Sequence, residues 1–298
     1  MSHPATQPAI DTATDVPARA VQIWSEGSRL AADLYMPAGA GPHPAVLLCH
    51  GWGGEKGHLA RYARKFAAAG FATLAFDYRG WGASDGRVVP VAGSPMLTEA
   101  GPATIEVQVI RQVVDPLDQI ADVRAAFAYL RGQPGIDTAR VALWGTSYGG
   151  GHVITVAANN PLVKAVVAQI GGFGPPDLPW FGELGLRRSE DKACGRLESP
   201  IPQGIDNAPG LKGTPDVARM QYHDPRQHAA NVRVPTLIID AEFEELVDRQ
   251  LHGIAVHRIL ERNVPTRYAT FPCTHYGVYD AHFDAGSDLA LEWFRTHL

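Results

Sequence analysis

The pattern Gly-x-Ser-x-Gly occurs twice in the chain, at Gly82–Gly86 and at Gly145–Gly149. Glycine on both sides of the serine lets a strand turn sharply into a helix, so that the hydroxyl is presented as a nucleophile. A proline-containing extended run follows the first match, whereas the second lies between the apolar run Val141–Trp144 and a stretch of small residues that favours a helix. The context therefore predicts Ser147 as the nucleophile and Ser84 as a polar loop residue.

A serine hydroxyl reacts at neutral pH only with a general base beside it, and a carboxylate usually orients that base. In a strand–turn–helix arrangement of this type, the acid and the base follow the serine in chain order, just after later strands. Of the 12 histidines, His275 has this position, because it follows the predicted strand Thr266–Phe271 by a few residues. The other histidines lie mostly on predicted helices, in the N-terminal segment or in an insertion. We therefore predict His275 as the base.

The acid is expected after the strand that begins at Thr236, where five carboxylates lie within nine residues, from Asp240 to Asp248. Asp240 still belongs to the strand. Glu244 lies a few residues beyond the strand end, where a loop carboxylate can reach back to the imidazole. We predict Glu244 as the acid, and the sequence leaves three alternatives open: Glu242, Glu245 and Asp248.

Backbone N–H groups that stabilise a developing oxyanion are expected at two places. One is the N–H of Tyr148, directly after the serine and at the N-terminus of the predicted helix. The other is the N–H of Trp52, in the loop His50–Gly54 that follows the apolar strand Ala45–Cys49. The glycines of this loop permit a close backbone approach, which an oxyanion hole requires.

Short apolar runs alternate along the chain with helix-length segments, which predicts an α/β fold with a mostly parallel central sheet and helices on both faces. The first two strands, Val21–Trp24 and Leu30–Met36, are expected to form an antiparallel edge pair. The remaining elements are predicted as strands Ala45–His50, Phe71–Tyr78, Arg140–Trp144, Val163–Ile170, Thr236–Ala241 and Thr266–Phe271 and helices His58–Ala69, Pro116–Leu130, Tyr148–Asn159, Val247–Leu260 and Asp284–His297.

Two long irregular segments interrupt this alternation: Arg87–Asp115 and, from Gly171 to about Asn231, a stretch rich in proline and glycine. Both leave the carboxyl ends of strands, where open α/β sheets place their ligands. We interpret the second segment as a cap over the site, with Trp180 and Phe181 as substrate-binding residues. Residues 1–20 are expected to form a flexible N-terminal arm and residues 21–298 a single domain that contains the cap.

Composition excludes several classes of function. The net charge is −5 without a basic run, so nucleic acid is not an expected partner. Neither a signal peptide nor an apolar stretch of membrane-spanning length is present, and we expect a cytoplasmic protein without a membrane partner. The three cysteines are widely spaced, and Cys49 is expected in the core. Because the sequence contains no cluster with metal-ligand spacing, no metal or cofactor is expected. The partner is expected to be a small acyl substrate, and a homodimer is compatible with the sequence.

The loop His50–Gly54, the run Asp77–Ser84, the elbow Gly145–Gly149 and the late His275 together resemble the α/β-hydrolase superfamily. Within it, the chain is similar to the dienelactone-hydrolase and prolyl-oligopeptidase-like branches over roughly residues 21–298. Such proteins usually have Gly-x-x-Asp after the acid-bearing strand, whereas this chain has Ala241-Glu242-Phe243-Glu244. The resemblance implies the fold and a serine triad, and it specifies the substrate poorly.

The leading functional interpretation is hydrolysis of a carboxylic ester, thioester or lactone through an acyl-enzyme. A peptidase or amidase is an alternative, although the prolyl-peptidase relatives use an additional large domain for which this chain leaves no room. An acyltransferase or cyclase with the same triad is a second alternative. A ligand-binding protein without catalysis would be expected to have a broken triad, whereas here all three residue types are available.

Overall fold

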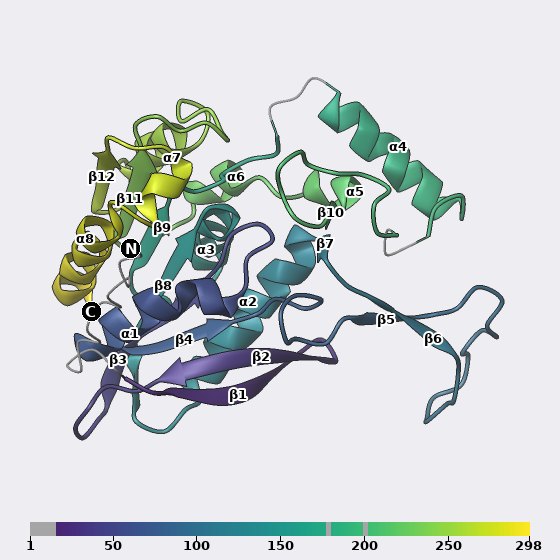
Figure 1. The fold of residues 1–298 in the computed structure, drawn as a ribbon, viewed down its shortest axis with the longest axis horizontal. Helices are drawn as coiled ribbons and strands as arrows, with labels where there is room; N and C mark the ends of the chain where they lie inside the picture. Colours follow the sequence, from purple (N-terminus) through teal and green to yellow (C-terminus); the bar gives the residue numbers. More distant parts are fainter. Residues whose placement is uncertain (1–15, 177–179, 199–201) are drawn as a thin grey trace, which may run out of the picture.

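The computed structural model describes residues 16–176, 180–198 and 202–298. Its centre is an eight-stranded sheet in the order β1-β2-β4-β3-β8-β9-β11-β12 (Figure 1). The pairs β1–β2 and β2–β4 are antiparallel, and all other neighbours in the sheet are parallel. The predicted mostly parallel sheet with an antiparallel edge pair is thus confirmed.

The parallel strands are almost continuous apolar runs, as expected for strands that helices cover on both faces. All five residues of β4 and all six of β11 are buried, and Cys49 at the end of β3 is also buried, as predicted. The strands of the sheet are β1 (Ala18–Ser25), β2 (Ser28–Tyr35), β3 (His43–Cys49), β4 (Ala72–Phe76), β8 (Ile136–Thr146), β9 (Val166–Gln169), β11 (Thr236–Ala241) and β12 (Thr266–Phe271).

Helices cover both faces of the sheet and form two apolar layers. One layer contains α1 (Ala60–Ala68), which follows the short 3-10 helix η2 (Lys56–Leu59), and α8 (Phe283–His297). The other contains α2 (Pro116–Arg131), α3 (Tyr148–Ala158) and α7 (Gly253–Leu260). Asp115 caps α2 by accepting hydrogen bonds from the N–H groups of Leu117 and Asp118, and Pro116 occupies the first helical position. Within the described parts of the chain, no helix is long and apolar enough to cross a bilayer.

Three predictions about the organisation of the chain need correction. The helix predicted from Val247 begins only at Gly253, because turns occupy the preceding residues; the Asp248 carboxylate, for example, accepts the N–H of Gln250. The N-terminal arm predicted for residues 1–20 overlaps β1, which begins at Ala18, and residues 1–15 lie outside the described part.

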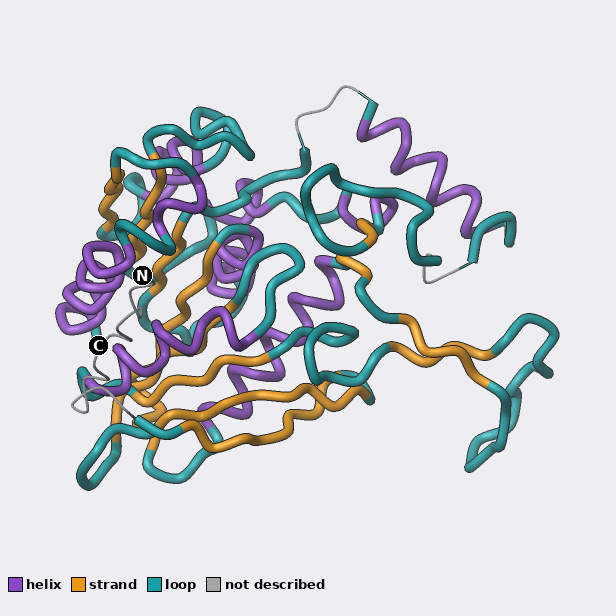
Figure 2. Tube along the Cα trace, in the orientation of Figure 1, coloured by secondary structure: helices purple, strands orange, loops and turns teal. Residues whose placement is uncertain are grey.

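The segment Arg87–Asp115 is not wholly irregular. It contains β7 (Val113–Val114) and the antiparallel pair β5 (Arg87–Pro90) and β6 (Val107–Ile110), which projects from the body (Figure 2).

The segment from Gly171 to Asn231 also contains more regular structure than expected. It holds α4 (Phe181–Ala193), β10 (Thr214–Pro215), α5 (Val217–Met220) and α6 (Pro225–Ala229). Strand β10 pairs with β7 in parallel, which joins this segment to the residues that lead into α2. Within the segment, Arg188 pairs with Asp206 at 2.8 Å, and the largely buried Lys192 pairs with Asp216 at 2.5 Å.

Two buried histidines join this segment to the sheet's helical layer. His152 of α3 and His223, between α5 and α6, approach to 3.2 Å between Nδ1 and Nε2, and the Nε2 atom of His152 lies 3.0 Å from the Gln119 side-chain oxygen. Burial lowers the pKa of His223 to about 3 and lowers the pKa of His152 well below its usual range. Both imidazoles are therefore neutral in the folded protein at pH values where an unfolded chain protonates them.

The buried His223 predicts a specific pH dependence of stability. Its pKa is lower in the folded state than its ordinary value of 6.5, so its contribution to stability is present above pH 6.5 and is lost as the pH falls toward 3. We expect His223→Gln to reduce the slope of the unfolding free energy between pH 6 and pH 4 by about 1.4 kcal/mol per pH unit, the effect of one proton. Urea unfolding at several pH values measures this slope. His58→Gln, a change at an exposed histidine outside this buried contact, is measured in parallel as the control. Equal slopes for His223→Gln and the wild type would contradict the prediction.

Candidate active site

The backbone turns sharply at Ser147, between the end of β8 and the start of α3. Ser147 has φ 54° and ψ −127°, a strained conformation for a residue with a side chain. Its N–H donates to the carbonyl of Gln169 at 2.9 Å, and its own carbonyl accepts the N–H of Gly150 at 2.8 Å. A Cβ atom on Gly149 would lie 2.4 Å from the carbonyl oxygen of His50. The close backbone approach at this turn thus requires the second glycine of the motif.

The structure brings the three predicted triad residues together. His275, at the start of the 3-10 helix η3 (His275–Val278), lies with Nε2 3.1 Å from the Ser147 hydroxyl oxygen. Its Nδ1 lies 2.8 and 2.9 Å from the two carboxylate oxygens of Glu244. With a neutral imidazole, the Nδ1–H group donates to Glu244, and Nε2 is left to accept the serine proton. Both His275 and Glu244 are almost completely buried, which strengthens their interaction.

The other carboxylates of the acid segment have different partners. Glu245 accepts the backbone N–H of His275 at 2.8 Å, and Glu242 accepts the Thr270 hydroxyl at 3.1 Å. Asp248 accepts a backbone N–H within its own turn. Asp240, at the end of β11, accepts the Tyr268 hydroxyl at 2.7 Å, and its burial raises its pKa to about 6. Glu244 is therefore the carboxylate of this segment that contacts the imidazole ring.

Ser84, the serine of the other Gly-x-Ser-x-Gly match, occupies a loop, as predicted, and its hydroxyl is used within the fold. It donates to the carbonyl of Asp77 at 2.6 Å and accepts the N–H of Ala31 at 2.9 Å. The side chain is buried, so the same sequence pattern serves a structural role here.

The loop after β3 passes directly beside the nucleophile. A Cβ atom on Gly51 would lie 2.7 Å from the Cβ atom of Ser147, so the backbone of this loop is in contact with the serine. Trp52 follows at once, and its ring packs on that of Tyr148 with the ring centroids 5.4 Å apart. The N–H of Tyr148 is one of the first in α3, where the helix itself offers no acceptor. This arrangement suits the predicted role of the Trp52 and Tyr148 N–H groups as oxyanion donors.

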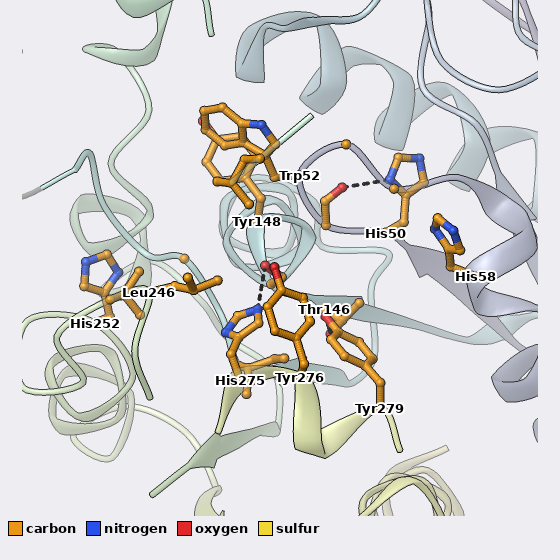
Figure 3. Close-up of a pocket in the computed structure, with 18 of the residues that line it drawn as sticks. His50, Trp52, His58, Thr146, Tyr148, Leu246, His252, His275, Tyr276 and Tyr279 are labelled. Atoms are coloured by element: carbon orange, nitrogen blue, oxygen red, sulfur yellow. Dashed lines mark hydrogen bonds between the residues drawn. The ribbon is translucent and has the colours of Figure 1, made fainter. Parts of the chain in front are cut away.

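A cavity of about 580 Å³ opens over the triad, and Ser147 and His275 line it. Trp52 and Tyr148 lie across it from Tyr276 and Tyr279 (Figure 3). The aliphatic side chains of the lining are those of Leu59, Ile170, Pro176, Leu211, Met220, Leu246 and Val247. Tyr276 and Leu246 could have been suspected from the sequence, since each lies within two residues of a predicted triad member. By contrast, Leu59, Leu211 and Met220 have no such signal in the sequence.

The predicted substrate-binding pair needs correction. Neither Trp180 nor Phe181 is among the described residues that line the cavity. Trp180 precedes α4 and is 53% exposed, whereas Phe181 is buried in the apolar layer that includes Val217 and Met220. The segment does contribute to the cavity wall, but through Gly172, Gly174, Pro176, Leu211 and Met220.

Beneath the nucleophile lies a buried polar network. The hydroxyls of Thr146 and Tyr279 are 2.9 Å apart. The side-chain N–H₂ of Gln169 approaches the Thr146 hydroxyl at 3.3 Å and the Tyr62 hydroxyl at 3.2 Å. The network ties the last residue of β8 to β9, α1 and the segment after His275. Among the residues that the structure describes, no group of three or more His, Cys, Asp or Glu side chains is arranged to hold a metal ion.

The eight-stranded sheet, the serine turn after β8 and the flanking helices define the α/β-hydrolase fold, and the chain is a hydrolase. Residues 26–210 match the family described as X-Pro dipeptidyl-peptidase (S15 family), and the chain belongs to this family.

Several proteins are similar to this chain in sequence. The chain is 28% identical over 309 residues to an uncharacterized 31.7 kDa protein of Escherichia coli, with 92% of this chain and 97% of that protein covered. It is 37% identical over 150 residues to the quorum-quenching protein AidA of Acinetobacter baumannii (strain MDR-ZJ06), with 50% and 42% covered. It is 31% identical over 144 residues to thiohydrolase aneE of Aspergillus aculeatus, with 48% and 38% covered.

Solved structures share the fold at low sequence identity. The α/β hydrolase GrgF from Penicillium sp. sh18 superposes with a TM-score of 0.72 at 16% identity, covering 94% of this chain and 99% of that one. The dienelactone hydrolase from Anabaena variabilis superposes with a TM-score of 0.57 at 19% identity, covering 95% and 98%. These likenesses confirm the predicted fold.

The geometry at Ser147 predicts selective labelling. A fluorophosphonate probe should react with Ser147, because its hydroxyl is hydrogen-bonded to a base and faces the cavity. We expect Ser147→Ala to abolish labelling and Ser84→Ala, where folded, to retain it. Peptide mapping by mass spectrometry identifies the labelled residue, and a label on Ser84 would contradict the prediction.

The position of Glu244 predicts a graded loss of serine reactivity. Glu244→Gln replaces the carboxylate with an uncharged amide, whose NH₂ group can donate to Nδ1 and favour the wrong imidazole tautomer. The rate of fluorophosphonate labelling should therefore fall by roughly 10²–10⁴-fold. Glu242→Gln is the matched control on the same loop and should change the rate far less, because Glu242 contacts Thr270 instead. A larger loss in Glu242→Gln than in Glu244→Gln would move the acid two residues earlier.

Proposed function

We propose that the protein is a serine hydrolase that cleaves a neutral carboxylic ester, thioester or lactone through an acyl-enzyme. The observation that carries the proposal is the hydrogen-bonded series Ser147–His275–Glu244 at the wall of a largely apolar cavity. In this proposal residues 21–298 act as one hydrolase domain, with residues 171–231 as its cap.

In the proposed mechanism, His275 Nε2 takes the hydroxyl proton of Ser147 as the serine oxygen attacks the carbonyl carbon of the substrate. The negative charge that develops on the carbonyl oxygen is stabilised by the N–H groups of Trp52 and Tyr148. Glu244 holds the imidazole and stabilises the imidazolium that forms. His275 then returns the proton to the leaving alcohol or thiol, and water hydrolyses the acyl-enzyme by the same steps in reverse.

The lining of the cavity supports an uncharged, mainly apolar acyl group. Leucine, isoleucine, valine, methionine, proline, tyrosine and tryptophan side chains make up half of the 22 described lining residues, and five more are glycines. A volume of about 580 Å³ is within the usual range for small-molecule sites. The names of two relatives, a quorum-quenching protein and a thiohydrolase, support a small-molecule substrate, and the second name supports a thioester in particular.

A second candidate function is release of an Xaa-Pro dipeptide from a peptide, which membership in the S15 family favours. The same triad chemistry would serve it, since acyl transfer from an amide and from an ester share the tetrahedral intermediate. The two candidates differ in the substrate, because a dipeptidyl substrate carries a terminal ammonium group and the ester substrate proposed here carries none.

The test is a substrate panel measured side by side. We expect p-nitrophenyl esters and acyl thioesters to be hydrolysed with a kcat/KM that rises with acyl length, by up to about fourfold per CH₂ group buried. Gly-Pro-p-nitroanilide should be cleaved at least about 10²-fold less efficiently, and Ser147→Ala should remove turnover of every substrate by a factor on the order of 10⁶. Preference for the Gly-Pro anilide would establish the second candidate, and turnover that survives in Ser147→Ala would exclude both.

A further inference from the structure

The side chain of Trp52 joins two segments that lie far apart in the sequence. Its indole N–H donates to the backbone carbonyl of Lys212 at 3.1 Å, across 160 residues. Trp52 belongs to the loop beside the nucleophile, and Lys212 belongs to the stretch that leads into β10. The bond therefore connects the proposed oxyanion loop to the proposed cap.

Two neighbours of Trp52 also contact Lys212. Gly53 has φ 63°, and a Cβ atom added to it would lie 3.0 Å from the Lys212 carbonyl oxygen, so only glycine permits this approach without strain. The Lys212 ammonium pairs with the Glu55 carboxylate at 3.2 Å. This ion pair is exposed and contributes little to stability by itself. It shows, however, that Glu55 contacts the same residue of the cap as Trp52 and Gly53 do.

The position of Lys212 is itself well determined. A Cβ atom on the next residue, Gly213, would lie 2.5 Å from the Trp81 ring, which is buried. The Trp81 indole N–H donates to the carbonyl of Val113 at 3.1 Å. Strand β10, which starts at residue 214, pairs with β7 at residues 113–114. Lys212 is thus anchored to the body of the molecule by the residues that immediately follow it.

On its other side, the Trp52 ring contacts the reacting centre through Tyr148. The two rings pack at 5.4 Å, and the backbone of Gly51 is in contact with Ser147. Figure 3 shows the Trp52 ring beside Tyr148, the residue that follows Ser147. The indole N–H is at the same time bonded to the Lys212 carbonyl, so the side chain is held by both residues. The anchored indole and the close approach of Gly53 to Lys212 therefore fix the conformation of the loop segment to which the Trp52 N–H group belongs.

We propose that the Trp52 side chain is a positioning residue, which uses the Lys212 carbonyl as an anchor to hold the Trp52 N–H group where the oxyanion forms. This inference rests on the proposed function and adds a second role for residues 211–213, since Leu211 also lines the cavity. The reason for a large effect is geometric: an oxyanion donor acts only when it is already in place, and a displacement of about 1 Å can cost 10²-fold in rate.

The primary test is Trp52→Phe, which keeps an aromatic ring against Tyr148 and removes the indole N–H. We expect kcat on a p-nitrophenyl ester to fall by roughly 10–100-fold, with KM changed less than about threefold, because the lost interaction acts on the transition state. The inhibition constant of a trifluoromethyl ketone, which forms an oxyanion adduct with the serine, should rise in parallel. Trp24→Phe is the matched control, since Trp24 lies on β1 and is 67% exposed, and it should behave as the wild type.

A second variant changes the residue next to Lys212, on the cap side of the contact between Trp52 and Lys212. Gly213→Ala places a methyl group against Trp81 and should displace Lys212, with the same loss of kcat. In the double variant the losses should not multiply, because both changes break one connection. Multiplying losses, or a raised KM with unchanged kcat in Trp52→Phe, would overturn the inference. Full activity of Ser147→Ala would instead overturn the proposed function, so the two failures are distinguishable.

Discussion

The left-handed backbone of Ser147 is the constraint on which the rest of the site depends. A residue with a side chain at φ 54° costs on the order of 1–3 kcal/mol, and such a conformation persists only where its surroundings determine it. Here the surroundings are β8, which pairs with β3 and β9 in the middle of the sheet, and α3, most of which is buried. The sharp turn between β8 and α3 places Ser147 at the carboxyl edge of the sheet, where its side chain lines the cavity.

The base and the acid reach this serine because of strand register. Strands β11 and β12 are parallel neighbours, with Asp240 opposite Thr270, so the loops that follow them emerge side by side. Glu244 and His275 are 31 residues apart in sequence and yet meet at 2.8 Å. The hydrogen bond from the backbone N–H of His275 to the Glu245 carboxylate holds the two loops together near this contact. One carboxylate of the pair thus orients the ring while its neighbour fixes the backbone.

Residues of both the hydrolase core and the inserted segment line the cavity. The core contributes Ser147, the loop after β3 and the tyrosines that follow His275, and the insertion contributes Leu211 and Met220. The insertion is attached by contacts of different kinds, which include the β7–β10 pairing and the buried contact between His152 and His223. The insertion therefore contacts the loop that lies against Ser147, so a change in the insertion can alter the surroundings of this serine.

The sequence by itself determined the architecture and singled out Ser147 as the predicted nucleophile, because both signals are encoded locally. Apolar runs specify buried strands, and the strand–glycine–serine–glycine–helix order at residues 141–158 distinguishes Ser147 from Ser84 without tertiary information. His275 was also predictable, since its position just after a strand edge follows from topology. For the acid, the sequence narrowed the choice to a few carboxylates and favoured Glu244. Only the folded loop, held by Thr270 and His275 on neighbouring segments, decided which of them faces the imidazole.

The conformation of the inserted segment, and the side chains that it presents to the cavity, were decided by tertiary contacts alone. Its proline and glycine content predicted an irregular cap with Trp180 and Phe181 at the substrate, but α4 forms there and directs Phe181 into an apolar layer. Which side of a helix meets the core depends on partners that are distant in sequence, here Val217 and Met220. The same holds for the bond between Trp52 and Lys212, since a contact across 160 residues leaves no local pattern. Local propensity specifies elements, whereas long-range packing decides which side chains they present to a site.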